Sequence, residues 1–207
     1  MLLKAFALLA FASSILTQAL AIDDDEDIMR QELHDRINQA ASAQTMTGQN
    51  TTQSFLIKTR LLPNQSTTTN LSRFDNLYLS SVRTGAGTGD AVFTSNVTEG
   101  LQAFFNATTT KYPDYLAPLN FVGVSYPYAF KPTSSAYSDW SFVQINAGND
   151  GAAVLKETLD YQYAGPLPWM VCDWWHGKPQ LFIKKTILHP VTPPMGCADI
   201  ELKKIWL

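Results

Sequence analysis

The chain has 207 residues, a formal net charge of −3 at pH 7 and a hydrophobic content of 45%. The charge is unevenly divided. Residues 22–53 carry seven acidic and two basic side chains (−5), residues 54–207 carry eleven acidic and twelve basic ones (+1), and Lys4 adds +1. The body is therefore close to neutral and has no basic run of the kind that nucleic acid or an anionic membrane requires. Composition and charge exclude nucleic acid as the expected partner.

Residues 1–21 have the pattern of a secretory signal peptide. Lys4 supplies a basic start, residues 5–16 are apolar, and residues 19–21 fit the small-x-small cleavage rule. The apolar run is shorter than the about 20 residues that span a bilayer, and no later segment is long or apolar enough to do so. We expect a secreted, extracellular protein without a membrane span, with an uncleaved anchor as the alternative.

Two further features agree with export. Cys172 and Cys197 are the only cysteines, and an oxidising compartment favours a disulfide between them over a reactive or metal-binding pair. Five Asn-x-Ser/Thr triplets predict a glycoprotein whose acceptor residues lie on surface loops. The predicted acceptors are Asn50, Asn64, Asn70, Asn96 and Asn106.

Residues 22–53 form an acidic leader. Apolar residues recur at every fourth position from Met29 to Ala41, which indicates a short amphipathic helix between residues 28 and 43. No dibasic pair separates the leader from the body, so a largely flexible leader is favoured over a removable pro-segment. The body, residues 54–207, has the size of one ordinary domain.

The body is predicted to be all-β, with about ten short strands separated by turn residues and with little helix. This pattern favours a β-sandwich or a closed barrel, with a β-trefoil as the alternative. A turn of helix is expected only within residues 96–105. The predicted strands are 55–61, 77–82, 91–94, 102–106, 120–124, 140–145, 152–156, 170–174, 180–184 and 198–205.

A glycine-rich loop covers residues 85–89. Such a loop binds phosphate where it opens onto a helix, but the residues that follow it here have the pattern of a strand, so a hairpin is favoured. Residues 82–87 also resemble residues 143–148, which suggests a duplicated hairpin.

The sequence contains no motif for a metal, a cofactor or a nucleophile. A Gly-x-Ser-x-Gly elbow, a His-Glu-x-x-His pair and a paired Cys-x-x-Cys knuckle are all missing. His34 lies in the leader, and neither His176 nor His189 has a close set of acidic or thiol companions. We predict no metal site and no cofactor.

Residues 169–177 hold three of the five tryptophans, one cysteine and one histidine. Side chains alternate along a strand, so Cys172 and Trp174 share one face, and Trp169, Asp173 and Trp175 share the other. Since a half-cystine prefers burial, we expect the first face to meet the core, with Trp174 covering the disulfide.

That orientation leaves Asp173 between two flat rings on the opposite face. Two aromatic rings around one carboxylate form a platform for a sugar or another ring-bearing ligand. The structural alternative is that this face is covered and that Asp173 accepts a buried hydrogen bond. The predicted ligand-binding residues are Trp169, Asp173, Trp175 and His176.

Five blocks of the body carry a resemblance to a known family. These blocks are residues 74–79, 84–87 together with 90–92, 145–148, 169–182 and 197–202. Together they resemble a family of small secreted fungal proteins known only as a domain of unknown function. The resemblance implies a fungal, extracellular source and a two-cysteine framework, and it implies no activity.

The function that we expect is non-enzymatic binding or surface interaction outside the cell, with a glycan or a host or cell-surface molecule as partner. The first alternative is a secreted hydrolase that uses Asp173 as acid or base beside His176. The second alternative is a structural component of a cell wall or matrix.

Overall fold

In this computed structural model the described residues are 53–63, 70–106, 112–134, 138–165, 167–174, 177–185 and 191–207. The chain divides into two units, Met1–Thr45 and Met46–Leu207, and all described residues belong to the second. The predicted signal peptide and the leader up to residue 52, with its predicted helix, lie outside the described residues. So do Asn50, Asn64, Trp175, His176 and His189.

The described residues form eleven strands and two short 3₁₀ turns, so the all-β prediction is confirmed. Each of the ten predicted strands overlaps an observed one, and the turn η2 (Val97–Glu99) lies within the segment where a turn of helix was expected. The turn η1 spans Leu71–Phe74. The strands are β1 (Ser54–Leu61), β2 (Tyr78–Gly85), β3 (Thr88–Thr94), β4 (Gln102–Phe105), β5 (Leu116–Phe121), β6 (Tyr128–Pro132), β7 (Trp140–Ala147), β8 (Ala153–Leu155), β9 (Trp169–Asp173), β10 (Pro179–Lys184) and β11 (Cys197–Trp206).

Strands β5 and β6 depart most from the sequence-based prediction. Strand β6 was missed, because it is short and Pro127 and Pro132 lie at its two ends. Strand β5 begins four residues before the predicted start. The prediction placed the start too late because Pro118 interrupts the apolar pattern, although all six residues of the strand are buried. Because proline is uncommon inside strands, a prediction from the alternation of apolar residues misses β6 and the first half of β5.

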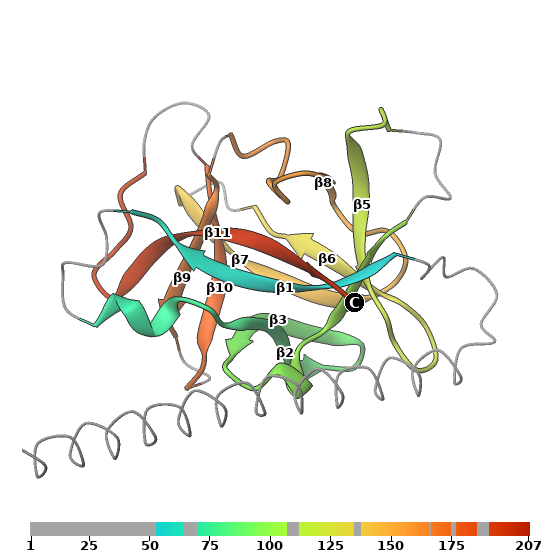
Figure 1. The fold of residues 1–207 in the computed structure, drawn as a ribbon, viewed down its shortest axis with the longest axis horizontal. Helices are drawn as coiled ribbons and strands as arrows, with labels where there is room; N and C mark the ends of the chain where they lie inside the picture. The colour runs from blue at the N-terminus through green and yellow to red at the C-terminus, as the bar shows by residue number, and fades with distance from the viewer. Residues whose placement is uncertain are drawn as a thin grey trace, which may run out of the picture. The chain divides into compact units, whose positions relative to one another are not determined.

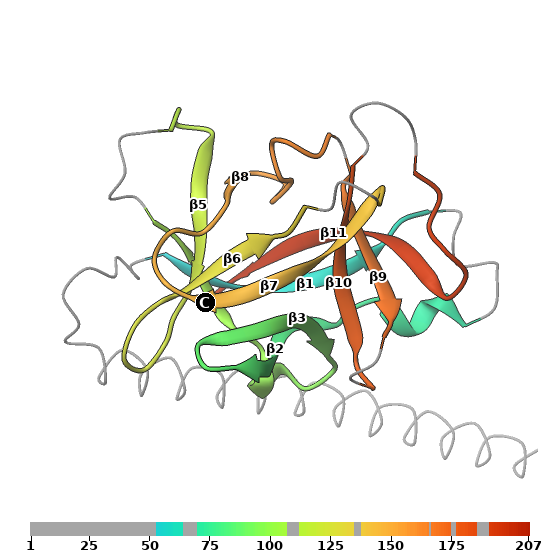
Figure 2. The ribbon, with the colours of Figure 1, turned by 180° about the vertical axis from the view of Figure 1, so that it is seen from behind.

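The strands form one antiparallel sheet that curls back on itself. Its main path runs β10-β9-β11-β1-β2-β3-β7-β6-β5-β4, and β8 pairs with β5. Extra pairings of β1 with β4, and of β10 with β3 and β7, join strands that are distant along this path. In Figures 1 and 2, β1 and β11 lie side by side across the middle, with β9 and β10 at one end and β5 at the other.

The glycine-rich loop is the turn of the β2–β3 hairpin, as predicted. Gly85 pairs with Thr88 across the turn, and Gly87 has a positive φ of 71°, which glycine adopts without strain. The residues after the loop continue as β3 and not as a helix. The loop therefore lacks the helix N-terminus that a phosphate loop needs.

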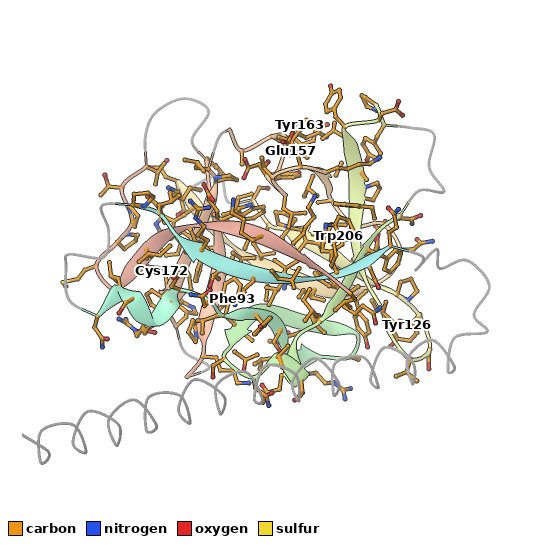
Figure 3. All side chains as sticks on the ribbon, viewed as in Figure 1. Phe93, Tyr126, Glu157, Tyr163, Cys172 and Trp206 are labelled. Atoms are coloured by element: carbon orange, nitrogen blue, oxygen red, sulfur yellow. A yellow bond between two sulfur atoms is a disulfide. The ribbon has the colours of Figure 1, made fainter. Side chains whose placement is uncertain are left out.

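The interior of the curled sheet holds the main hydrophobic core (Figure 3). Aromatic and branched side chains from nearly every strand meet there, among them Phe55, Phe93, Phe121 and Phe130. A second, smaller cluster consists of Met170, Cys172 and Phe182, with Trp140 and Cys197 packed against it. Strands β9 and β10 contribute to both clusters, which explains why their sequences are apolar at consecutive positions.

The predicted disulfide joins Cys172 to Cys197. The two residues are direct partners in the pairing of β9 with β11, and their Cα atoms are 4.1 Å apart. The disulfide therefore links neighbouring strands at one end of the sheet.

Candidate functional site

The alternation predicted for β9 is present and Cys172 is buried as expected, but the opposite face is buried too and meets the larger core. Trp169 and Val171 are fully buried in the main core, and Cys172 lies on the face of the smaller cluster. The indole N–H of Trp169 donates to the carbonyl oxygen of Leu159 at 3.2 Å, and its ring packs edge-to-face on Phe130 at 5.5 Å. Trp169 is therefore a core residue, and its predicted role as a stacking surface for a ligand is wrong.

Asp173, at the end of β9, is exposed. Its carboxylate forms an ion pair with the guanidinium of Arg73 at 2.5 Å. Arg73, Asp173 and Lys178 line a shallow hollow of about 370 Å³, and Lys178 is itself paired with Glu99 at 2.9 Å. The charges around Asp173 are thus matched within the chain, and its predicted neighbours Trp175 and His176 lie outside the described residues.

Trp174 was expected to cover the disulfide from within the core, and this expectation is wrong. It shares the face of Cys172 but is 48% exposed. Its ring lies 6.0 Å from that of Trp140 and 5.4 Å from that of Phe182, both edge-to-face. With Phe142, these rings line a hollow of about 320 Å³, here called the Trp140 hollow. Aromatic rings therefore do gather at this end of the sheet. The rings that line the hollow include those of Trp140 and Trp174, and not that of Trp169.

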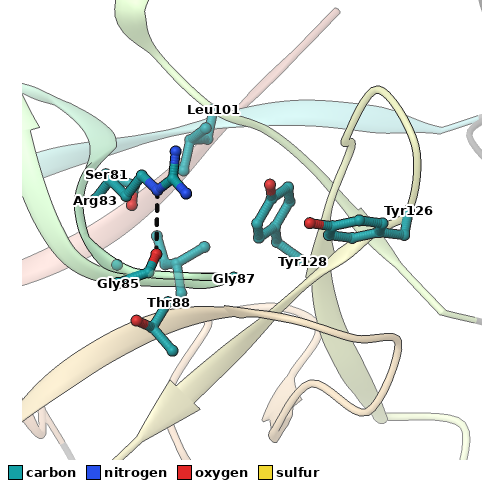
Figure 4. Close-up of a pocket in the computed structure, with 10 residues that line it drawn as sticks. Ser81, Arg83, Gly85, Gly87, Thr88, Leu101, Tyr126 and Tyr128 are labelled. Atoms are coloured by element: carbon teal, nitrogen blue, oxygen red, sulfur yellow. Dashed lines mark hydrogen bonds between the residues drawn. The ribbon is translucent and has the colours of Figure 1, made fainter.

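A different hollow, of about 370 Å³, lies at the other end of the sheet (Figure 4). Figure 3 shows Tyr126, on its rim, far from Cys172. We call it the Arg83 hollow. Its lining residues are Ser81, Arg83, Gly85, Gly87, Thr88, Gly89, Leu101, Tyr126, Tyr128 and Ile145.

The β2–β3 hairpin forms one wall of the Arg83 hollow. Ser81 and Arg83 alternate along β2 and so point to one face, and an irregularity in the pairing with β3 separates Arg83 from Gly85. The partner of Arg83 on β3 is Gly89, where a Cβ atom would lie 2.4 Å from the Ser81 hydroxyl oxygen. A side chain at position 89 would therefore displace Ser81 from this wall.

Tyr126 and Tyr128 form the opposite wall. Tyr128 begins β6, Tyr126 lies in the preceding turn, and their ring centroids are 5.4 Å apart. A Cβ atom at Gly123 would lie 2.0 Å from the Tyr126 carbonyl oxygen and 2.8 Å from the Tyr128 ring. Only glycine at position 123 allows the turn to bring both rings to this place.

The floor of the Arg83 hollow is apolar. Ile145 is a buried member of the main core, and Leu101 packs against the same core. A polar rim over an apolar floor is the usual construction of a small-molecule site.

The polar groups of the rim influence one another. A hydrogen bond with the Tyr126 side chain, followed by burial, raises the pKa of the Tyr128 hydroxyl above its usual value of 10.0, and the charge of Arg83 acts in the opposite direction. The Nε atom of Arg83 donates to the carbonyl oxygen of Gly85 at 3.1 Å (Figure 4). The Tyr128 hydroxyl is therefore a neutral donor at pH 7, beside a fixed guanidinium.

Sequence reasoning missed the Arg83 hollow, although one signal pointed toward it. The two segments that resemble each other, 82–87 and 143–148, end side by side, because the amide of Ala147 donates to the carbonyl oxygen of Gly87 at 2.6 Å. Both segments contribute residues to the hollow. The internal resemblance therefore marks two segments that meet at one hollow.

Neither a metal site nor a membrane helix is found in the described part of the chain. No three His, Cys, Asp or Glu side chains gather there into a group that could hold a metal ion. No helix there has the length and the apolar content that crossing a membrane takes.

Comparison with known proteins gives a family but no activity. A family model described as Domain of unknown function (DUF7907) matches residues 52–206. The match covers most of the chain, which therefore belongs to this family, and membership in a family of unknown function is confirmed. No curated protein and no solved structure matches the chain significantly.

Proposed function

We propose that this member of the DUF7907 family is a secreted, non-enzymatic glycoprotein of fungal origin that binds a ring-bearing ligand, with a glycan as the expected class, in the Arg83 hollow. The observation that carries the proposal is the hollow itself. Leu101 and Ile145 are apolar lining residues of the hollow, which also carries one guanidinium and two phenol groups.

The size of the hollow supports a small ligand. Sites for small molecules have volumes of about 300 to 1,000 Å³. At about 370 Å³, the Arg83 hollow is at the lower end of this range. One or two sugar rings match this space better than a folded protein surface does.

The exposure of Tyr126 supports stacking as the main contact. The residue is 45% exposed, and its ring stands at the edge of the hollow. A phenol ring offers a flat apolar face together with a hydroxyl group, and it loses little conformational entropy on binding. A sugar ring, with one apolar face and several hydroxyl groups, complements such a surface.

The surroundings of Asp173 favour binding over hydrolysis. A carboxylate that hydrolyses a glycosidic bond works together with a second carboxylate on the other side of that bond. Asp173 is instead exposed and paired with Arg73. Two features are compatible with export, namely the disulfide and the near-neutral charge of the body. Both suit a protein that stays folded outside the cell.

The test is a glycan array probed with the full chain, purified from the medium of a secreting host. We expect wild-type protein to bind a subset of glycans and Tyr126→Ala to lose about tenfold in affinity, the effect of one lost aromatic contact. Tyr115→Ala is the matched control, because Tyr115 is 63% exposed and lies outside the hollow.

Two results would reject this proposal. One is binding that Tyr126→Ala leaves unchanged and that Trp174→Ala removes, which would place the ligand in the Trp140 hollow. The other is the absence of any Tyr126-dependent ligand on the array.

A further inference from the structure

Arg83 differs from the other arginines of the described part of the chain. Arg60 pairs with Glu201 at 3.8 Å and Arg73 pairs with Asp173 at 2.5 Å. Arg83 forms no ion pair with any described carboxylate, and no acidic side chain lines its hollow. A guanidinium that has no carboxylate partner among the described residues, on the rim of a hollow, is the feature that an anionic ligand would match.

We propose that the ligand of the Arg83 hollow carries a carboxylate on its ring, that Arg83 binds this carboxylate through its two terminal nitrogens, and that a uronate sugar is the ligand class. This inference rests on the proposed function and names the chemistry of its ligand. It makes Arg83 the residue that selects acidic over neutral rings.

The geometry of Arg83 suits two parallel hydrogen bonds. Its Nε atom is already engaged, since it donates to the carbonyl oxygen of Gly85 at 3.1 Å. Figure 4 shows the guanidinium extending from this bond toward the side of the hollow where Tyr128 stands. The bond to Gly85 orients the guanidinium plane, and the two terminal nitrogens match the two oxygens of a carboxylate.

The apolar floor strengthens this contact. Charges interact more strongly near a low-dielectric surface than in open water, and Ile145 and Leu101 provide such a surface. The Tyr128 hydroxyl beside Arg83 stays neutral, so it adds no negative charge that would repel the same carboxylate. A neutral ring in the same place would leave the guanidinium without an anionic partner.

The experiment compares two ligands of the same shape and different charge. Binding of trigalacturonate and of its methyl ester is measured by calorimetry with the full chain, at low and at high salt. Benzoate and benzamide form a second pair, which separates a uronate ring from an aromatic acid as the source of the carboxylate. Each pair is measured with wild-type protein, Arg83→Gln, Arg83→Lys and the control Arg60→Gln, a surface arginine outside the hollow.

We expect wild type to bind trigalacturonate about 10 to 100 times more tightly than its methyl ester, the range of a hydrogen-bonded charge. Arg83→Gln should abolish this preference, and Arg83→Lys should retain only part of it, because an ammonium cannot make two parallel bonds. High salt should weaken the binding of the acid and not of the ester. Arg60→Gln should bind as wild type does, and thermal melts of all variants should coincide.

Three outcomes would overturn the inference. Equal affinity for acid and ester that depends on Tyr126 would leave the proposed function standing and remove the charge selection. A preference for benzoate over trigalacturonate would assign the hollow to aromatic acids. Absence of binding to all four compounds would end the inference, and the glycan array would then decide the proposed function separately.

Discussion

Trp169 and Trp174 lie five residues apart in one segment and occupy opposite environments. Trp169 is fully buried and donates a hydrogen bond to Leu159, whereas Trp174 is 48% exposed. Replacement of a buried aromatic side chain by alanine removes apolar contacts and leaves a cavity. A surface ring has far fewer contacts to lose.

We therefore expect Trp169→Ala to lower the free energy of unfolding by about 3 to 5 kcal/mol. Trp174→Ala should lower it by about 1 kcal/mol or less. Urea denaturation followed by circular dichroism measures both values. Equal losses would contradict the assignment of the two faces of β9.

The three glycosylation acceptors among the described residues also differ. Asn70 and Asn96 are exposed, and the Asn96 side chain accepts a hydrogen bond from the amide of Thr98 at 3.0 Å. Asn106 is buried, and its side-chain nitrogen, the atom that would carry a glycan, donates to the carbonyl oxygen of Asn149 at 3.1 Å. A glycan on Asn106 would have to displace this packing.

We predict that the secreted, folded protein carries no glycan on Asn106. Mass spectrometry of peptides after enzymatic removal of glycans should show the deamidation mass at Asn96, at Asn70 or at both, and not at Asn106. Asn106 found occupied in protein with the wild-type melting temperature would be incompatible with its buried position.

At the scale of elements, two lysines near the ends of β10 form ion pairs that differ in burial. Lys184 is buried and pairs with Asp199 of β11, whereas Lys178, which precedes β10, pairs with Glu99 at the surface. Removal of one partner of a buried pair leaves a buried charge, while an exposed pair is weakened by water and salt.

Lys184→Met should therefore lower the free energy of unfolding by about 3 to 5 kcal/mol. Lys178→Met, the matched control, should lower it by about 1 kcal/mol or less. Denaturant midpoints at constant pH test the difference. A loss at position 184 as small as that at position 178 would show that the Lys184–Asp199 pair does not hold β10 to β11.

At the scale of the whole molecule, stability must depend on pH through carboxylates that folding perturbs. Burial, and after it the charge of Glu201, raise the pKa of Asp160 above its ordinary value of 3.8, although Thr158 and Lys203 act in the opposite direction. A raised pKa in the folded state means that the folded state prefers the protonated acid. The ionised form therefore destabilises the fold, and this cost appears as the pH rises above about 3.8.

Asp160→Asn should consequently be more stable than wild type at pH 7, and the difference should disappear near pH 3, where both states of the wild-type residue are protonated. Thermal melts across this pH range measure the effect. A variant that is less stable than wild type at pH 7 would contradict the sign of the pKa shift.

The strands of the fold can be predicted from the sequence more fully than the candidate site can. The β2–β3 hairpin and strand β1 follow from alternation and turn residues within a few positions, which are local properties. The disulfide follows from there being only two cysteines. The orientation of β9 could not be predicted, because both of its faces are apolar and the alternation does not tell which face meets the larger core.

The Arg83 hollow shows the same limit more strongly. Its lining residues come from β2, β3, the segment before β4, the start of β6 with the turn before it, and β7, so residues from position 81 to position 145 meet in one place. Nothing local marks Arg83, Tyr126 and Tyr128 as neighbours. Their meeting depends on the β3–β7 and β6–β7 pairings and on the space left at Gly89 and Gly123.

The sequence by itself determined the all-β class, most strand positions, the glycine hairpin and the partner of each cysteine, because these depend on local periodicity or on simple counting. Only the tertiary structure decided which face of β9 is the core, which acceptor asparagine is buried, and where a ligand can bind. These properties depend on contacts between strands that are distant in the chain, and the order of strands in a sheet is not encoded in the pattern of any single strand.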